Sequence, residues 1–77
     1  MKPYMKLRML MFKMNIKQTD LCDICHRKET YIGERMRAEN GRYFTVEDMA
    51  RIAEALNIPE TDIWNYFSLK ERNGAKL

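Results

Sequence analysis

The sequence predicts a small, all-helical domain, and three observations lead to this prediction. The chain has 77 residues, which is enough for one domain and too few for a second. Residues that interrupt helices are sparse, with three glycines and two prolines in all. Apolar residues recur with the 3.6-residue period of a helix, and only Tyr43-Phe44 suggests a short extended segment.

The first two predicted helices cover residues 4–15 and 18–25. In the first, apolar residues recur at intervals of three and four positions. In the second, Leu21, Ile24 and Cys25 share one face. Both segments are therefore expected to turn an apolar face toward the core.

The third predicted helix covers residues 29–37 and follows a polar turn of three residues. Ile32 and Met36 are expected to face inward. The residues expected to stay mostly outside are Thr30, Tyr31, Glu34, Arg35 and Arg37. Two short helices joined by so short a turn form a helix-turn-helix arrangement, in which the first helix is held in the core and the second is presented.

The fourth predicted helix begins at Thr45, whose hydroxyl precedes the Asp48 carboxylate by three residues, as in a capping box. We expect it to end at Asn57. Its apolar face is expected to consist of Val46, Met49, Ala50, Ile52, Ala53 and Leu56.

A short fifth helix is expected over residues 59–67, because proline is favoured in the first turn of a helix. Residues 68–77 are polar and are expected to form a flexible tail. The expected organisation is thus one domain over residues 1–67, followed by that tail.

Charge is distributed unevenly along the chain. Residues 1–19 carry five basic and no acidic side chains, whereas residues 20–77 carry nine basic and eleven acidic ones. A basic end favours a polyanionic partner such as nucleic acid or a membrane surface, although lysines on a solvated helix face give the same pattern. No apolar run is long enough to cross a bilayer and no signal peptide is recognisable, so a cytoplasmic protein without a membrane partner is expected.

The segment from Cys22 to His26 matches the C-x-x-C-H string of c-type haem attachment. That chemistry requires export, a zinc site would need a fourth ligand, and a redox C-x-x-C motif would follow a strand. We therefore expect Cys22 and Cys25 to be small apolar residues on the inner side of their helix, and we expect no metal and no cofactor. A metal or redox function through these residues stays as a third alternative.

Enzymatic activity is not expected. Single carboxylates such as Asp20 and Glu34 lack a general-acid partner, and His26 has no serine near it in the sequence. A chain of this length also has little room for an enclosed pocket, so no small-molecule substrate is evident.

The polar face of residues 29–37 offers groups that bind DNA. Gln18 would present an amide and a helix N-terminus to a phosphate. The further candidate contacts are Lys28, Glu29, Thr30, Tyr31, Glu34 and Arg37. Cations attract phosphates, while glutamate, threonine and tyrosine are able to read base edges. A solvated helix face has a similar composition, so both interpretations remain open.

From Leu7 to Phe67 the sequence resembles the Cro/repressor (XRE-type) helix-turn-helix family. In that family a glutamine opens the second helix, as Gln18 does here, and a Leu-Ala pair follows, matched by Leu21-Cys22. An aliphatic residue anchors the next helix eleven positions after that leucine, as Ile32 does. The run FTVEDMARIAEALNIPETDIWNYF is similar to the close of small phage-type members.

The resemblance implies a five-helix, lambda-repressor-like domain whose third helix enters the major groove of double-stranded DNA. It implies transcription regulation of the phage or prophage Cro or repressor kind. The contact positions it implies are Gln18, Glu29, Thr30, Tyr31 and Glu34, with phosphate contacts near Arg37 and Arg42. A domain this small grips few base pairs, so a homodimer is expected, paired through the first helix or through the fifth helix and tail.

Three residues depart from the family pattern. His26 replaces the turn glycine, Arg27 replaces an apolar turn residue, and Gly33 lies inside the third helix. The alternative function is a protein-interaction module, such as an antitoxin or antirepressor, that keeps the fold without reading DNA. Glu29 and Glu34 on the outer face favour that alternative.

Overall fold

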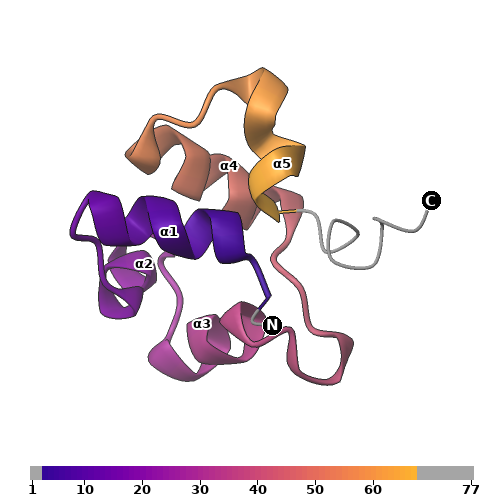
Figure 1. The fold of residues 1–77 in the computed structure, drawn as a ribbon. Helices are drawn as coiled ribbons and strands as arrows, with labels where there is room; N and C mark the ends of the chain where they lie inside the picture. The colour runs from indigo at the N-terminus through magenta and orange to yellow at the C-terminus, as the bar shows by residue number, and fades with distance from the viewer. Residues whose placement is uncertain (1–2, 68–77) are drawn as a thin grey trace.

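The structure, a computed structural model, describes residues 3–67 (Figure 1). The helices are α1 (Met5–Lys13), α2 (Gln18–Cys25), α3 (Glu29–Met36), α4 (Val46–Leu56) and α5 (Ile63–Phe67), with 3-10 turns η1 (Glu39–Gly41) and η2 (Glu60–Asp62). No strand occurs within residues 3–67, so the prediction of an all-helical fold is confirmed. The predicted tail, residues 68–77, lies outside the described residues.

The helix bounds differ from the predicted ones only at their ends. α1 begins and ends within the predicted 4–15, α3 stops one residue early at Met36, and the predicted fifth helix opens with the 3-10 turn η2. Such end residues depend on how the last turn is closed, which the apolar period does not specify.

α1 lies across the front of the molecule in the view of Figure 1. Figure 1 places α4 and α5 on one side of α1 and α2 and α3 on the other. α2 contacts both α3 and α4, and α5 contacts both α1 and α4. This arrangement leaves one side of α3 without a helix packed against it (Figure 1).

The core takes a fully buried aliphatic residue from each of the first four helices: Leu7, Leu21, Ile32 and Ile52. Burying each such side chain stabilises the fold by about 1.5–3 kcal/mol. Ile32 and Met36 are the inward residues of α3, as the sequence predicts. They fix the rotation of α3 and therefore decide which of its residues face outward.

Three aromatic rings, those of Tyr4, Phe44 and Phe67, pack against one another where the two ends of the described chain meet. The Phe44 ring centroid lies 5.5 Å from that of Tyr4 and 6.0 Å from that of Phe67. Phe44 belongs to the extended connection before α4, which forms no strand. These tilted and edge-on ring pairs tie the start of α1 to the end of α5.

The prediction for the apolar face of α4 is wrong at two positions. Val46 is 76% exposed and Ala50 is exposed, while Asp48 is fully buried. The capping box with Thr45 forms as predicted, and it turns the Asp48 side chain toward α2 and α3. The buried side of α4 therefore starts at Asp48 and leaves Val46 in solvent.

Two further predictions about side-chain placement need correction. Cys25 is buried but Cys22 is only partly buried, because its position lies at the edge of the inner face of α2. Tyr31, Glu34 and Arg35 are half-buried, although they were expected to lie mostly outside. Each of the three contacts another charged or aromatic side chain, as described below.

Candidate nucleic-acid interface

α2 and α3 are joined by His26, Arg27 and Lys28, the predicted three-residue turn. His26 adopts the left-handed conformation, with φ 58°, and the backbone N–H groups of His26 and Arg27 both donate to the carbonyl of Cys22. A non-glycine residue in this conformation costs roughly 1 kcal/mol. The turn therefore keeps the shape that a glycine would give it, at some cost in stability.

Arg51 of α4 also holds the end of α2. Its Nη1 donates to the carbonyl of Cys25 at 3.1 Å, and its Nη2 pairs with the Glu47 carboxylate at 2.9 Å. The last carbonyls of a helix lack intrahelical donors, so this arginine supplies one. The sequence analysis missed this role, since no local pattern links residues 25 and 51.

The first turn of α3 is open to solvent. Lys28, Glu29 and Thr30 are exposed, and their side chains form no hydrogen bond or ion pair within residues 3–67. The helix begins without a side-chain cap, so no side chain occupies the backbone N–H groups of its first turn. An acceptor such as a phosphate oxygen can therefore approach these donors.

Gln18 lies next to the middle of α3. A Cβ atom placed on Gly33 would lie 3.6 Å from Nε2 of Gln18 and 3.3 Å from Nη1 of Arg37. Gly33 thus leaves space where these two side chains converge. Glycine inside a helix lowers stability by about 0.5–1 kcal/mol relative to alanine. At Gly33 the absence of a side chain is explained by the nearby ends of Gln18 and Arg37.

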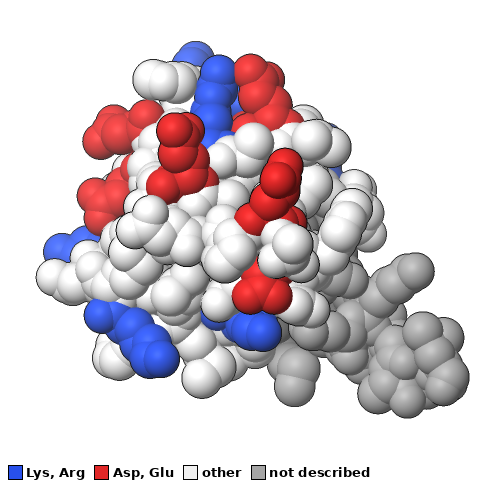
Figure 2. Space-filling view, turned by 90° about the horizontal axis from the view of Figure 1, so that it is seen from above, with Lys and Arg blue, Asp and Glu red and all other residues white. Residues whose placement is uncertain are grey.

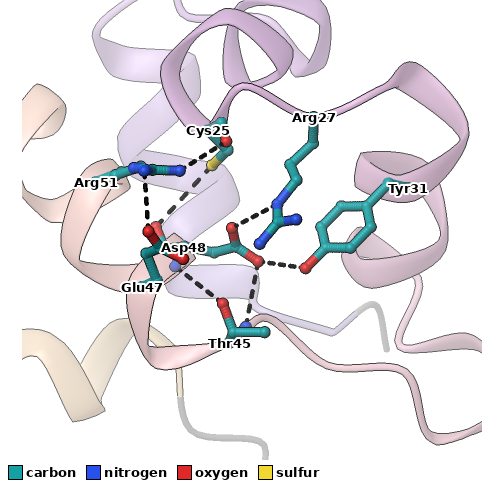
Figure 3. A network of polar contacts seen from close by, with 7 residues as sticks. All are labelled: Cys25, Arg27, Tyr31, Thr45, Glu47, Asp48 and Arg51. Carbon is teal, nitrogen blue, oxygen red and sulfur yellow. Dashed lines mark hydrogen bonds and ion pairs between the residues drawn. The ribbon is translucent and has the colours of Figure 1, made fainter.

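The hydroxyl of Tyr31 is directed away from solvent. It donates to the carboxylate of Asp48, which also accepts from Nε of Arg27 at 3.1 Å and from the backbone of Thr45 (Figure 3). The Tyr31 ring lies between two guanidinium groups, 3.7 Å from Cζ of Arg35 and 4.5 Å from Cζ of Arg27. This contact network orients α3 against α4 through the turn.

Ionisation of this network follows from its contacts. Burial alone would raise the pKa of Asp48, but the hydrogen bonds that its carboxylate accepts outweigh burial and hold that pKa below its usual value. Burial and the bond to Asp48 raise the pKa of Tyr31. At neutral pH the pair is therefore a carboxylate and a neutral phenol donor.

The three remaining candidate residues, Glu34, Arg37 and Arg42, are paired with charges. The Glu34 carboxylate lies 3.5 Å from Nη1 of Arg35 and 3.8 Å from Nη1 of Arg42. Arg37 pairs with Glu39 at 3.2 Å. The candidate set thus divides into residues with unpartnered side chains, Gln18, Lys28, Glu29 and Thr30, and residues with intramolecular contacts, Tyr31, Glu34, Arg37 and Arg42.

Charge is distributed unevenly along the described chain. Residues 3–17, which include α1, carry four basic and no acidic side chains, and residues 18–42, which include α2 and α3, carry five of each. Residues 43–67, which include α4 and α5, carry one basic and five acidic side chains, a net charge of −4. Figure 2 looks onto the side of α4 and α5, where acidic side chains gather. α3 lies on the opposite side of the molecule (Figure 1).

Among the described residues, the cysteines form no cluster with other metal-binding groups. Within residues 3–67 no three His, Cys, Asp or Glu side chains come close enough together to hold a metal ion. Burial raises the pKa of Cys25 to about 11, and that of Cys22 is raised as well. Both are free thiols, and the Cys25 thiol lies against the carbonyl of Asp48.

None of the helices described is both long and apolar enough to cross a bilayer. No protein-family model matches the chain, and no curated protein and no solved structure matches it significantly. The functional argument therefore depends on the geometry and charge of the α2–α3 surface.

Proposed function

We propose that the protein binds double-stranded DNA in a sequence-specific manner and regulates transcription, with α3 lying in the major groove. The observation that carries this proposal is the exposed start of α3, with unpartnered Lys28, Glu29 and Thr30, on the side of the molecule away from the acidic side of α4 and α5. The three-residue turn between α2 and α3 supports a helix-turn-helix of the lambda-repressor-like kind.

The dimensions of α3 suit this role. A helix with its side chains is about 10–12 Å across, and the major groove of B-DNA is about 12 Å wide. Helix-turn-helix proteins contact base edges with the N-terminal residues of the second helix, which is the part of α3 that is free of intramolecular contacts.

The free residues divide into two kinds of contact. Lys28 and Gln18, together with the N–H groups at the start of α3, suit phosphate oxygens and would position the protein. Thr30 and Glu29 suit base edges, since a hydroxyl serves several bases and a carboxylate accepts from the amino group of cytosine. Arg37 and Arg42 would add phosphate contacts after exchanging their glutamate partners.

A matched pair of lysine variants tests the proposal. Lys28→Ala and Lys13→Ala each remove one exposed, unpaired cation, but only Lys28 lies at α3. We expect Lys28→Ala to weaken binding of a selected duplex about tenfold and to reduce the slope of log affinity against log salt by about one. Lys13→Ala should change affinity less than twofold.

Fluorescence anisotropy of a labelled duplex at several salt concentrations measures both quantities. Equal losses in the two variants would mean that the affinity reflects overall charge, and the assignment of α3 would be wrong.

The second candidate function is a protein-interaction module, such as an antitoxin or antirepressor. Glu29 favours it, because an unpaired carboxylate at the start of α3 would repel phosphates unless it meets a base donor. This function predicts no preference among DNA sequences even at low salt, together with a tight complex with a partner protein.

A further inference from the structure

α1 carries two apolar stripes, and the described chain covers only one of them. Leu7 and Met11 on the inner side are buried in the core. Met5, Met9 and Phe12 form the outer stripe at positions i, i+4 and i+7, and the side chains of Met9 and Phe12 are 61% and 87% exposed. The core of the described chain uses only the inner stripe, so the outer stripe indicates a further contact.

The outer stripe borders a groove between α1 and α5. Tyr66 of α5 lines the groove together with Leu10 and the outer stripe. The charged residues that line it are all basic: Lys6, Arg8 and Lys13. Nζ of Lys6 lies 5.1 Å from the centre of the Tyr66 ring, and Arg8 donates to the carbonyls of Pro3 and Met36.

The geometry points to a docking site for an acidic, amphipathic helix of a second protein. Apolar side chains at intervals of three and four positions would cover Met9 and Phe12, as in other helix-in-groove complexes. Carboxylates beside that stripe would meet Lys6 and Lys13. The nine residues of α1 span about 13.5 Å, which suits a partner segment of about three turns. Flexible methionine side chains adapt readily to such a surface.

Charge disfavours occupants from this chain itself. Two α1 helices placed face to face would bring two sets of cations together. Residues 68–77 carry three basic and one acidic side chains, so their charge has the same sign as the groove. An anionic bilayer has the right charge, but one stripe of three side chains gives weak interfacial binding. A separate acidic helix satisfies both the charge and the spacing.

This inference does not rest on the proposed DNA-binding function. Figure 1 places α5 and α3 on opposite sides of α1, so the groove and the free face of α3 are different surfaces. Phe12→Ala is accordingly expected to leave DNA affinity unchanged, and Lys28→Ala to leave helix docking unchanged.

The test uses the full chain with ¹³C-labelled methionine methyl groups. The probe is a synthetic helical peptide of about three turns with leucines along one face and glutamates elsewhere; its counterpart carries lysines in place of the glutamates. We expect the glutamate peptide to shift the Met5 and Met9 methyl resonances saturably, and the lysine peptide to leave them unchanged. Phe12→Ala should weaken binding about tenfold, as expected for loss of an aromatic anchor.

Trp64→Ala is the matched control, because Trp64 is also an exposed aromatic residue, at 68%, and does not line the groove. The Trp64→Ala variant should bind the glutamate peptide with the same affinity as the unchanged protein. The proposal is overturned if the glutamate peptide gives no saturable shift or if the lysine peptide binds equally well. It is also overturned if sedimentation shows that the unchanged protein is a dimer and that Phe12→Ala is a monomer. A further contradicting result would be that the protein binds phosphatidylserine vesicles but not the peptide, and that Phe12→Ala abolishes the vesicle binding.

Discussion

The carboxylate of Asp48 joins three segments of the chain: the turn before α3, α3 itself and the start of α4. Its link to Thr45 follows from the capping-box pattern and is predictable from the sequence. The burial of this carboxylate cannot be predicted from the sequence, because its partners Tyr31 and Arg27 lie 17 and 21 positions away. A polar residue three positions after a helix start is ordinarily exposed, and only the packing of α4 against α2 removes this one from water.

Asp48→Asn should destabilise the fold by about 2–4 kcal/mol, because it removes the charge from a buried, paired carboxylate and leaves Arg27 and Tyr31 poorly matched. Urea unfolding measures the change. Glu47→Gln is the control: its carboxylate is largely exposed, so the loss should be less than about 0.5 kcal/mol. Equal effects would mean that the network contributes little to stability.

Stability should also depend on the charge state of Asp48. Since its pKa in the folded protein lies below its usual value, its contribution is complete above about pH 4 and is lost as the pH falls through the lower folded value. Urea midpoints between pH 6 and pH 2.5 should fall more steeply for the unchanged protein than for Asp48→Asn. Parallel curves for the two proteins would contradict a lowered pKa.

At the scale of the elements, the apolar period together with the start signals at Thr45 and Pro59 predicts all five helices, and the inner residues of α3 are the predicted Ile32 and Met36. The period is less informative where a helix begins. Val46 fits the apolar pattern of α4 but lies in solvent, because it lies nearly opposite the buried Asp48 on the helix. The half-burial of Tyr31 likewise depends on a neighbour from α4 that periodicity does not reveal.

Gly33→Ala should separate the stability of α3 from its function. Alanine favours the helix by roughly 0.5–1 kcal/mol, and the added Cβ meets only the mobile ends of Arg37 and Gln18. We therefore expect a small rise in the free energy of unfolding and weaker DNA binding, because the Arg37 guanidinium must move by a few tenths of an ångström. Urea unfolding and anisotropy measure the two effects. A fall in stability, or unchanged binding, would contradict this account of Gly33.

At the scale of the whole molecule, charge differs between the parts of the chain. The excess of positive charge lies in residues 1–19, as the sequence shows, while residues 18–42 carry five basic and five acidic side chains. Residues 43–67 carry five acidic side chains and one basic one, and acidic groups gather on the side of α4 and α5 (Figure 2). A field of this kind would orient the molecule with α3 toward a polyanion.

A homodimer remains a prediction at this scale. One α3 helix contacts few base pairs, so two copies would bind half-sites about one turn of DNA apart, and the preferred sequence would be palindromic. The expected surfaces are α1, or α5 with the tail. If the outer stripe of α1 binds an acidic helix, α5 is left as the dimer surface.

Selection of bound duplexes from random DNA, repeated with Thr30→Ala, tests the central claim most directly. The claim predicts that the unchanged protein enriches a defined motif and that Thr30→Ala alters the preferred base at one position of it, with discrimination changed by about 1–3 kcal/mol. Enrichment of no motif, or of the same motif with the same preferences by both proteins, would contradict the claim that α3 reads DNA.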